Sequence, residues 1–181
     1  MLRGLLTVTI GVVALGVAAL VVSQNVPGLI PGTAEPNSFG DWAVRCIDRP
    51  NVDPCDVVQS LNDTKAKKTV MQVSYAYSPA KDMYAAQIML PLGYMLQAGV
   101  LIRLDGKTDI QDYPFTRCEP EGCFIEKLLK EKDLAALRNA KEGVILVMNR
   151  EGKAVGFPFS LKGFGDAVDS MARRNKKAAG K

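Results

Sequence analysis

The chain has 181 residues, a length that suits one domain with an appendage. Its formal charge of +4 comes from the last nine residues, which carry five cations and no acid, so the other 172 residues sum to −1. A nucleic-acid-binding domain needs a basic face, so this charge does not favour that class. The chain contains no histidine, which excludes Ser-His and Cys-His catalytic pairs.

Residues 1–23 are predicted to insert into a membrane. No residue from Gly4 to Val22 is charged. As a helix this run would be about 28 Å long, close to the roughly 30 Å hydrocarbon core of a bilayer. A core helix of a small domain would show a polar stripe, and here Thr7 and Thr9 are the only polar side chains.

The segment is either a retained transmembrane anchor or a long signal peptide. Signal peptides have an apolar stretch of roughly 7–15 residues, and this run is longer, with a poor best cleavage site after Ser23. A retained anchor is therefore favoured. Arg3 precedes the run and the next basic residue is Arg45, which predicts a cytoplasmic N-terminus and a periplasmic domain on the bacterial inner membrane. Cleavage would instead give a periplasmic or secreted protein.

A linker, a folded domain and a tail follow the apolar segment. Residues 24–40 are rich in proline, glycine and small polar residues, which is typical of a linker. The composition changes at Asp41-Trp42, where the domain, residues 41–172, begins. The basic tail, residues 173–181, is predicted to be disordered, and it could contact anionic phospholipid heads or an acidic partner if the anchor is retained.

Short apolar–polar runs between turn residues predict β-strands in the domain. The predicted strands are residues 42–47, 55–61, 69–77, 83–90, 100–104, 113–118, 123–126, 144–148 and 155–160. Apolar residues at helical spacing predict two short helices, at 128–140 and 163–171. Many short strands and few helices indicate a mainly β fold, an antiparallel β-sandwich.

All four cysteines lie beyond the apolar segment, with spacings C-x8-C and C-x4-C. An even number of cysteines in an exported domain predicts disulfides. Local pairs, Cys46 with Cys55 and Cys118 with Cys123, are favoured, because crossed pairing such as Cys46 with Cys118 must first bring distant strands together. The spacings fit no common zinc pattern, so no metal site is predicted.

The sequence indicates function by contact rather than catalysis. It has no glycine-rich phosphate loop, and nothing in it indicates a cofactor or a small-molecule substrate. Leu90-Pro91-Leu92-Gly93 is interpreted as a sandwich corner rather than a binding loop. Because aromatic residues are common interface hot spots, Tyr75, Tyr77, Tyr84 and Tyr94 are the candidate partner-binding residues. The alternative is that all four lie in the core.

Several of these segments, in this order, resemble the invasion-associated locus B family of bacterial cell-envelope proteins. They are Trp42 with Cys46 and Cys55; Leu90-Pro91-Leu92-Gly93 leading into Gly99-Val100 and Leu104-Asp105; Pro114-Phe115 with Cys118 and Gly122-Cys123; and Ser160-Leu161-Lys162-Gly163-Phe164. The resemblance covers about residues 38–172.

The resemblance implies an immunoglobulin-like β-sandwich, an exported location and two local disulfides. It also implies an association, in some members, with entry into host cells, but no catalytic residues. The leading hypothesis is a non-enzymatic, membrane-tethered binding protein with a protein partner in the cell envelope, for example as a single-pass accessory subunit of an inner-membrane complex. The alternative is a secreted or surface-associated factor that promotes host-cell entry, and an envelope enzyme of unfamiliar type is the third hypothesis.

Overall fold

The computed structural model describes residues 37–47, 53–63 and 67–180. The predicted membrane segment, residues 1–23, and the predicted linker as far as residue 36 lie outside these ranges. Among the residues that are described, no helix is long and apolar enough to cross a membrane.

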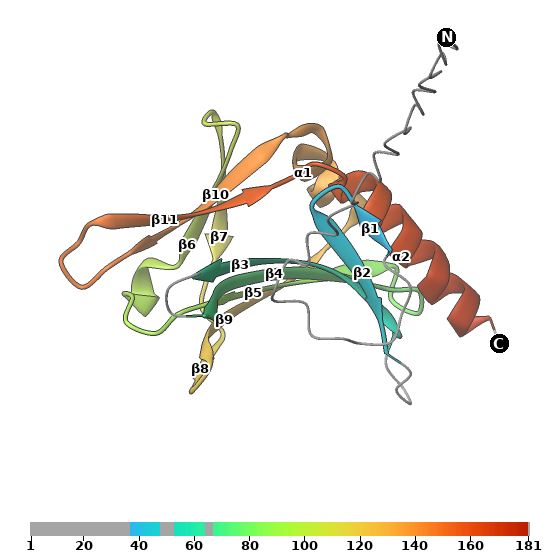
Figure 1. Cartoon of the computed structure of the whole chain (residues 1–181), viewed down its shortest axis with the longest axis horizontal. Helices are drawn as coiled ribbons and strands as arrows, with labels where there is room; N and C mark the ends of the chain where they lie inside the picture. Colours follow the sequence, from blue (N-terminus) through green and yellow to red (C-terminus); the bar gives the residue numbers. More distant parts are fainter. Residues whose placement is uncertain (1–36, 48–52, 64–66, 181) are drawn as a thin grey trace, which may run out of the picture. The chain divides into compact units, whose positions relative to one another are not determined.

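The described residues form two antiparallel β-sheets (Figure 1). The larger sheet has seven strands in the order β1-β2-β3-β4-β5-β9-β8, so its first five strands are a meander. These strands are β1 (Ser38–Phe39), β2 (Trp42–Cys46), β3 (Cys55–Asp63), β4 (Lys68–Ser78), β5 (Met83–Leu90), β9 (Gly122–Leu129) and β8 (Arg117–Glu119).

The smaller sheet has four strands in the order β11-β10-β6-β7. They are β6 (Val100–Leu104), β7 (Thr108–Tyr113), β10 (Glu142–Met148) and β11 (Ala154–Ser160). The edge strand β11 contains Pro158, which has no backbone N–H to offer to a further strand. Pro158 therefore disfavours the pairing of a further strand with this edge of the sheet.

Helix α2 (Phe164–Ala179) packs on β2, β3 and β4, and Figure 1 shows it at one end of the larger sheet, with the smaller sheet over the other end. The remaining helical segments are short: η1 (Leu96–Ala98), η2 (Glu131–Leu134) and α1 (Ala135–Asn139). One continuous hydrophobic core includes residues of both sheets and of α2.

Strict alternation in β4 makes one face of the larger sheet apolar. Met71, Val73, Tyr75 and Tyr77 are buried, whereas the side chains between them are only partly buried. Tyr75 lies beside Phe164 of α2 and near Trp42, with ring centroids 5.0 and 6.0 Å away. Aromatic pairs at these separations stabilise beyond their buried area, so this cluster fixes the first turn of α2 on the sheet.

Two glycines allow the turn before β2 to touch the turn before α2. Gly40 and Gly163 both have positive φ, +58° and +81°. A Cβ on Gly163 would lie 2.1 Å from the carbonyl oxygen of Phe39, and one on Gly40 would lie 2.4 Å from that of Lys162. Only glycine tolerates both the backbone conformation and the contact, which explains why the domain needs glycine at both positions.

The mainly β fold with two antiparallel sheets and short helices is confirmed, and the predicted strands 83–90 and 100–104 have the observed bounds. The immunoglobulin-like prediction is not confirmed. Immunoglobulin sheets combine strands by Greek-key connections, whereas five consecutive strands of the larger sheet here are neighbours.

Three predictions of local structure are wrong. The predicted strand 113–118 is split, because β7 ends at Tyr113 and β8 begins at Arg117, and the strand Thr108–Tyr113 was not predicted. The predicted helix 128–140 begins late, since β9 continues to Leu129. The tail, predicted to be disordered from residue 173, is helical as far as Ala179, because α2 extends through it.

Candidate functional site

Two surfaces at opposite ends of β5 stand out from the rest of the domain. Strand β5 runs from Met83 to Leu90, so the turn before it and the loop after it lie at different ends of the sheet. The loop of residues 91–99 is here named the apolar loop. The cavity beside the β4–β5 turn is here named the lysine cavity, and it is lined by Tyr77, Lys81, Asp82, Met83, Tyr84, Lys130, Glu131, Lys132 and Lys176.

The apolar loop exposes large hydrophobic side chains. Leu92, Met95 and Leu96 are 55%, 41% and 44% exposed. Two other large hydrophobic residues of the described ranges are comparably exposed: Ile47, directly after β2, and Leu128 in β9. Isolated exposed hydrophobics are ordinary, but three within five positions form a patch of the kind found at interaction sites.

The apolar loop is fixed to the β10–β11 hairpin. The backbone N–H of Met95 donates to the carbonyl oxygen of Met148 at 2.9 Å, and Tyr94 forms an isolated β-bridge with Asn149. The Tyr94 ring meets Phe157 edge-on with centroids 5.9 Å apart, and its partial burial raises the pKa of the Tyr94 phenol. The loop therefore presents its exposed side chains on an ordered backbone.

The lysine cavity has a volume of about 580 Å³ and brings together three separate segments of the chain. Lys81 lies in the β4–β5 turn, Lys130 and Lys132 lie at the start of η2, and Lys176 lies on α2. Four lysines and two acids line it, so cations outnumber carboxylates. The Lys176 ammonium lies 5.2 Å from the centroid of the Tyr77 ring, within the range of a cation–π contact.

Both carboxylates of the cavity accept hydrogen bonds from tyrosines. The Tyr77 hydroxyl donates to Asp82 at 2.7 Å, and the Tyr84 hydroxyl donates to Glu131 at 2.6 Å. The bond to Asp82 is the main reason that the pKa of Tyr77 is raised, whereas burial comes first for the raised pKa of Tyr84, followed by its bond to Glu131. Both phenols therefore stay protonated at neutral pH and act as donors.

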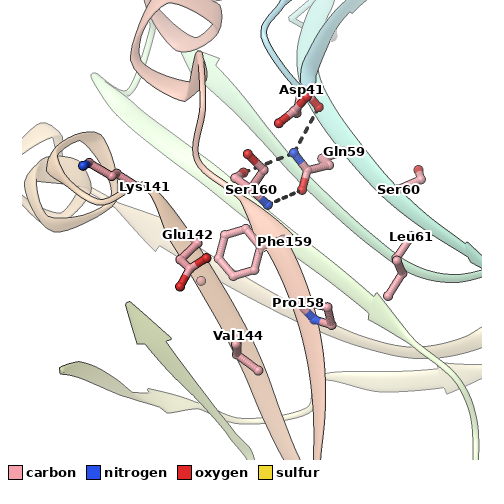
Figure 2. A pocket seen from close by; sticks show the side chains of 11 residues that line it. Asp41, Gln59, Ser60, Leu61, Lys141, Glu142, Val144, Pro158, Phe159 and Ser160 are labelled. Carbon is pink, nitrogen blue, oxygen red and sulfur yellow. Dashed lines mark hydrogen bonds between the residues drawn. The ribbon is translucent and has the colours of Figure 1, made fainter. Parts of the chain in front are cut away.

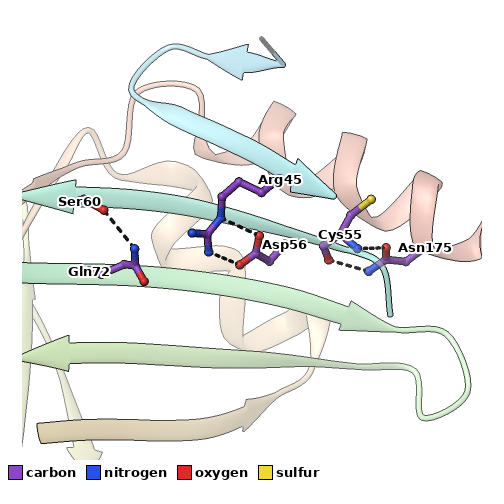
Figure 3. A network of polar contacts seen from close by, with 6 residues as sticks. All are labelled: Arg45, Cys55, Asp56, Ser60, Gln72 and Asn175. Atoms are coloured by element: carbon purple, nitrogen blue, oxygen red, sulfur yellow. Dashed lines mark hydrogen bonds and ion pairs between the residues drawn. The ribbon is translucent and has the colours of Figure 1, made fainter. Parts of the chain in front are cut away.

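Asn175 attaches the end of α2 to the larger sheet (Figure 3). Its side chain is fully buried. The side-chain oxygen accepts from the backbone N–H of Cys55, and the side-chain amide donates to the carbonyl oxygens of Cys55 and Tyr77, each at 2.9 Å. Asn175 thus completes the backbone hydrogen bonding where the β3–β4 ladder ends, which explains why this polar residue is tolerated in the core.

The structure contains the predicted disulfides Cys46–Cys55 and Cys118–Cys123, so local pairing is confirmed. The first lies under α2, with the Arg174 guanidinium 3.8 Å from the Cys46 sulfur. The second joins β8 to β9 next to the end of β5, where Leu90 pairs with Cys123. Two structural disulfides indicate a periplasmic or extracellular domain.

A third concave region, a groove of about 620 Å³, lies between β3 and the β10–β11 hairpin (Figure 2). Its central polar side chain is already engaged: the Gln59 amide donates to the carbonyl oxygens of Asp41 and Ser160 and accepts from the Ser160 backbone N–H at 2.8 Å. The Trp42 indole also donates to the Ser160 oxygen. These bonds join the two sheets, so the groove is a structural junction.

The four candidate tyrosines do not form one site. Tyr75, Tyr77 and Tyr84 are buried, as the alternative of core residues predicts for them, and Tyr94 is half-buried in the apolar loop. Tyr77 and Tyr84 nevertheless form the wall of the lysine cavity. Alternation along β4 and β5 could have predicted their burial, because both strands place them on the apolar face.

Sequence reasoning missed the exposed residues of both surfaces. The sequence pattern assigns Leu92 to a structural corner and gives no prediction for Met95 and Leu96. The lysines could not have been grouped, because they come from segments up to 95 positions apart, Lys81 and Lys176. Within residues 37–47, 53–63 and 67–180, no three Cys, Asp or Glu side chains are grouped so that they could hold a metal ion.

Comparison with known proteins gives one family and one fold. Residues 42–172 match the family model described as invasion associated locus B (IalB) protein. A solved structure, described as invasion associated protein b from Bartonella henselae, is similar with a TM-score of 0.68 and 19% sequence identity, over 79% of this chain and 99% of that chain. At this identity the structural similarity shows the fold alone. No curated protein sequence matches the chain.

Proposed function

The chain belongs to the invasion-associated locus B family, and from this premise we propose that it is a non-enzymatic envelope protein that binds a protein partner through its apolar loop. In this proposal the domain is periplasmic and is tethered to the inner membrane by residues 1–23, as an accessory subunit of a membrane complex. The family is not known as a family of enzymes, and its members supply no catalytic residue to transfer.

One observation carries the proposal: Leu92, Met95 and Leu96 are exposed together on a loop whose backbone is fixed. An exposed apolar side chain contributes little to folding, because it stays in contact with water. It contributes to binding when a partner covers it, and a loop that is already ordered loses less conformational entropy in doing so. The apolar loop therefore has the properties of a preformed contact surface.

The second candidate function is that of a secreted or surface-associated factor for host-cell entry. Membership of the invasion-associated family supports it, whereas the similar Bartonella henselae structure supports only the fold. The two proposals differ in the fate of residues 1–23, because a protein that has lost this segment is not an integral subunit. Peptide mass spectrometry of the mature protein separates them: peptides from residues 1–22 support the tether, and a mature N-terminus near Gln24 supports secretion.

The binding surface is tested by site-specific photo-crosslinking in the native envelope. A photoreactive residue at Gln97, within the apolar loop, should yield one crosslinked protein of defined mass. The same probe at Glu121, an exposed residue of the β8–β9 turn, is the positional control. The triple variant Leu92→Ser, Met95→Ser, Leu96→Ser should lose the product. The double variant Leu128→Ser, Ile47→Ser removes the comparably exposed apolar residues elsewhere and should retain it; equal loss in both variants would overturn the proposal.

A further inference from the structure

The lysine cavity combines uncompensated cations with carboxylates that are already engaged. Asp82 accepts from the Tyr77 hydroxyl, and Glu131 accepts from Tyr84 and also lies 2.9 Å from the Arg138 guanidinium. In the part of the chain that the structure describes, no carboxylate oxygen lies within 4.0 Å of the ammonium group of any of the four cavity lysines, Lys81, Lys130, Lys132 and Lys176. Four lysines that no carboxylate pairs with therefore line the cavity, and the ammonium of one of them, Lys176, lies over the Tyr77 ring in its wall.

The position of Lys176 is determined by the fold. The sequence predicted a disordered basic tail, whose lysines would each be free to move. Instead, Asn175 binds the backbone of β3 and β4, and the next residue extends its ammonium over Tyr77 in the cavity wall. The last turns of α2 therefore add a fixed cation to those of the β4–β5 turn and η2. A cation that is already held in place binds an anion with a smaller loss of entropy than a cation on a free tail does.

We propose that the lysine cavity binds the phosphate groups of anionic membrane lipids. Its four lysines match the negative charge of phosphate, for which lysine is a common ligand, and its volume of about 580 Å³ exceeds that of a phosphate group. The assignment to lipid rests on the membrane tether of the proposed function. The fourteen residues between Val22 and Asn37 span at most about 50 Å, which keeps the domain near the bilayer when the apolar segment is inserted.

The test uses the full chain in nanodiscs, with lysine acetylation followed by peptide mass spectrometry. In phosphatidylcholine nanodiscs the four cavity lysines should react like the exposed Lys107 and Lys153. Replacing a third of the lipid by phosphatidylglycerol should protect the cavity lysines severalfold and leave Lys107 and Lys153 unchanged. The protection should vanish at 1 M salt, where the screening length falls to about 3 Å. Absence of protection, or equal protection of all these lysines, would overturn the proposal.

Variants and a soluble anion sharpen the result. One lysine near the membrane surface is worth about a fivefold change in affinity, so the double variant Lys130→Gln, Lys176→Gln should bind about 25-fold more weakly. Protection at Lys81 and Lys132 should then be lost, whereas the control variant Lys107→Gln, Lys153→Gln should keep it. If inorganic phosphate protects the cavity as well as phosphatidylglycerol does, the lipid assignment is wrong.

The outcome is independent of the apolar-loop proposal. Reconstitution retains residues 1–23 whether or not a cell removes them, and no protein partner is present in the nanodiscs. If the cavity lysines are not selectively protected from acetylation, the lipid-site proposal is wrong and the proposed protein contact is unaffected. If no crosslinked product forms from Gln97, the proposed protein contact is wrong and the lipid-site proposal is unaffected.

Discussion

The two ends of the larger sheet each carry a disulfide, but they are stabilised in different ways. At the end with the lysine cavity, polar groups are joined over long sequence separations, as between Asn175 and Cys55 or between Tyr84 and Glu131. At the end with the apolar loop, the contacts are a backbone hydrogen bond from Met95 to β10, a β-bridge from Tyr94 to Asn149 and a disulfide that closes a six-residue hairpin. The first end depends on particular side chains and the second on local backbone geometry.

This difference separates residues that fold the domain from residues that are free to bind. Near the lysine cavity, Asn175, Tyr77 and Tyr84 are buried and hydrogen-bonded, so changing them should lower stability. In the apolar loop the exposed side chains make no comparable contribution, because water already surrounds them. The comparison therefore predicts large effects on stability at one end and small effects at the other.

Among the side chains whose hydrogen bonds stabilise the lysine-cavity end, the largest effect is expected for Asn175→Ala. This change leaves a buried N–H and two buried carbonyl oxygens without their partner. A buried polar group that loses its hydrogen bond costs about 1–3 kcal/mol, so the free energy of unfolding should fall by about 3 kcal/mol in total. Thermal unfolding monitored by circular dichroism measures the loss. Lys177→Ala, at an exposed position two residues further along α2, should change stability by less than about 0.5 kcal/mol.

Removal of the disulfides should have the next largest effect. The chain-entropy model gives about 2–3 kcal/mol for loops of this size. Cys46→Ala with Cys55→Ala should destabilise more than Cys118→Ala with Cys123→Ala, because the first disulfide closes the longer loop, with a sequence separation of 9 against 5, and because β8 is an exposed edge strand. Denaturant titration of both double variants measures the difference. A larger loss at the β8–β9 hairpin would contradict the comparison of the two ends.

Tyr84→Phe should have a moderate effect that depends on pH. It removes the hydrogen bond to Glu131, and at neutral pH it should cost about 1 kcal/mol, the usual net contribution of one hydrogen bond. Burial and Glu131 raise the pKa of Tyr84 in the folded protein. Its contribution is therefore complete below the unfolded pKa of about 10 and is lost as pH rises toward the folded pKa.

The free energy of unfolding of the wild type and of Tyr84→Phe, measured between pH 7 and pH 11, tests whether the contribution of Tyr84 falls as the pH rises. The wild type should lose its advantage over Tyr84→Phe above about pH 10, where only the unfolded wild type releases the additional proton. Tyr77→Phe is the matched comparison, because its phenol also has a raised pKa, mainly through Asp82. A difference that grows with pH would contradict the assigned donor role of Tyr84.

The strands could be predicted because their signal is local. Alternation and turn residues locate Met83–Leu90 and Val100–Leu104 to the residue, and the cysteine spacing predicts both disulfides. The continuation of α2 could not be predicted in the same way. Its last turns are polar, and the buried amide of Asn175 is explained only by the backbone of Cys55 and Tyr77, which lie about a hundred residues earlier.

The two candidate surfaces could not be predicted from the sequence, each for its own reason. The lysine cavity exists only because the β4–β5 turn, η2 and α2 meet, and no spacing along the chain encodes that meeting. The apolar loop is a different case. Leu90 and Leu92 have the same side chain and lie two positions apart, yet one is fully buried and the other is exposed. Alternation would place both on one face, and the Pro91–Gly93 break separates them.

The smallest effect on stability is expected for Leu92→Ser, and Leu90→Ser is its matched control. Leu92 is 55% exposed and Leu90 is fully buried between the sheets. Truncation of a buried leucine costs about 2–5 kcal/mol through lost burial and the cavity left behind. The Leu90→Ser protein should therefore unfold at a much lower temperature than the wild type. Leu92→Ser should stay within about 0.5 kcal/mol. Thermal unfolding of the two variants, combined with crosslinking from Gln97, separates the roles: a stable Leu92→Ser protein with weakened crosslinking identifies a binding residue. If Leu92→Ser destabilised the domain as strongly as Leu90→Ser, the loop would be part of the core, and the contrast between the two ends would no longer hold.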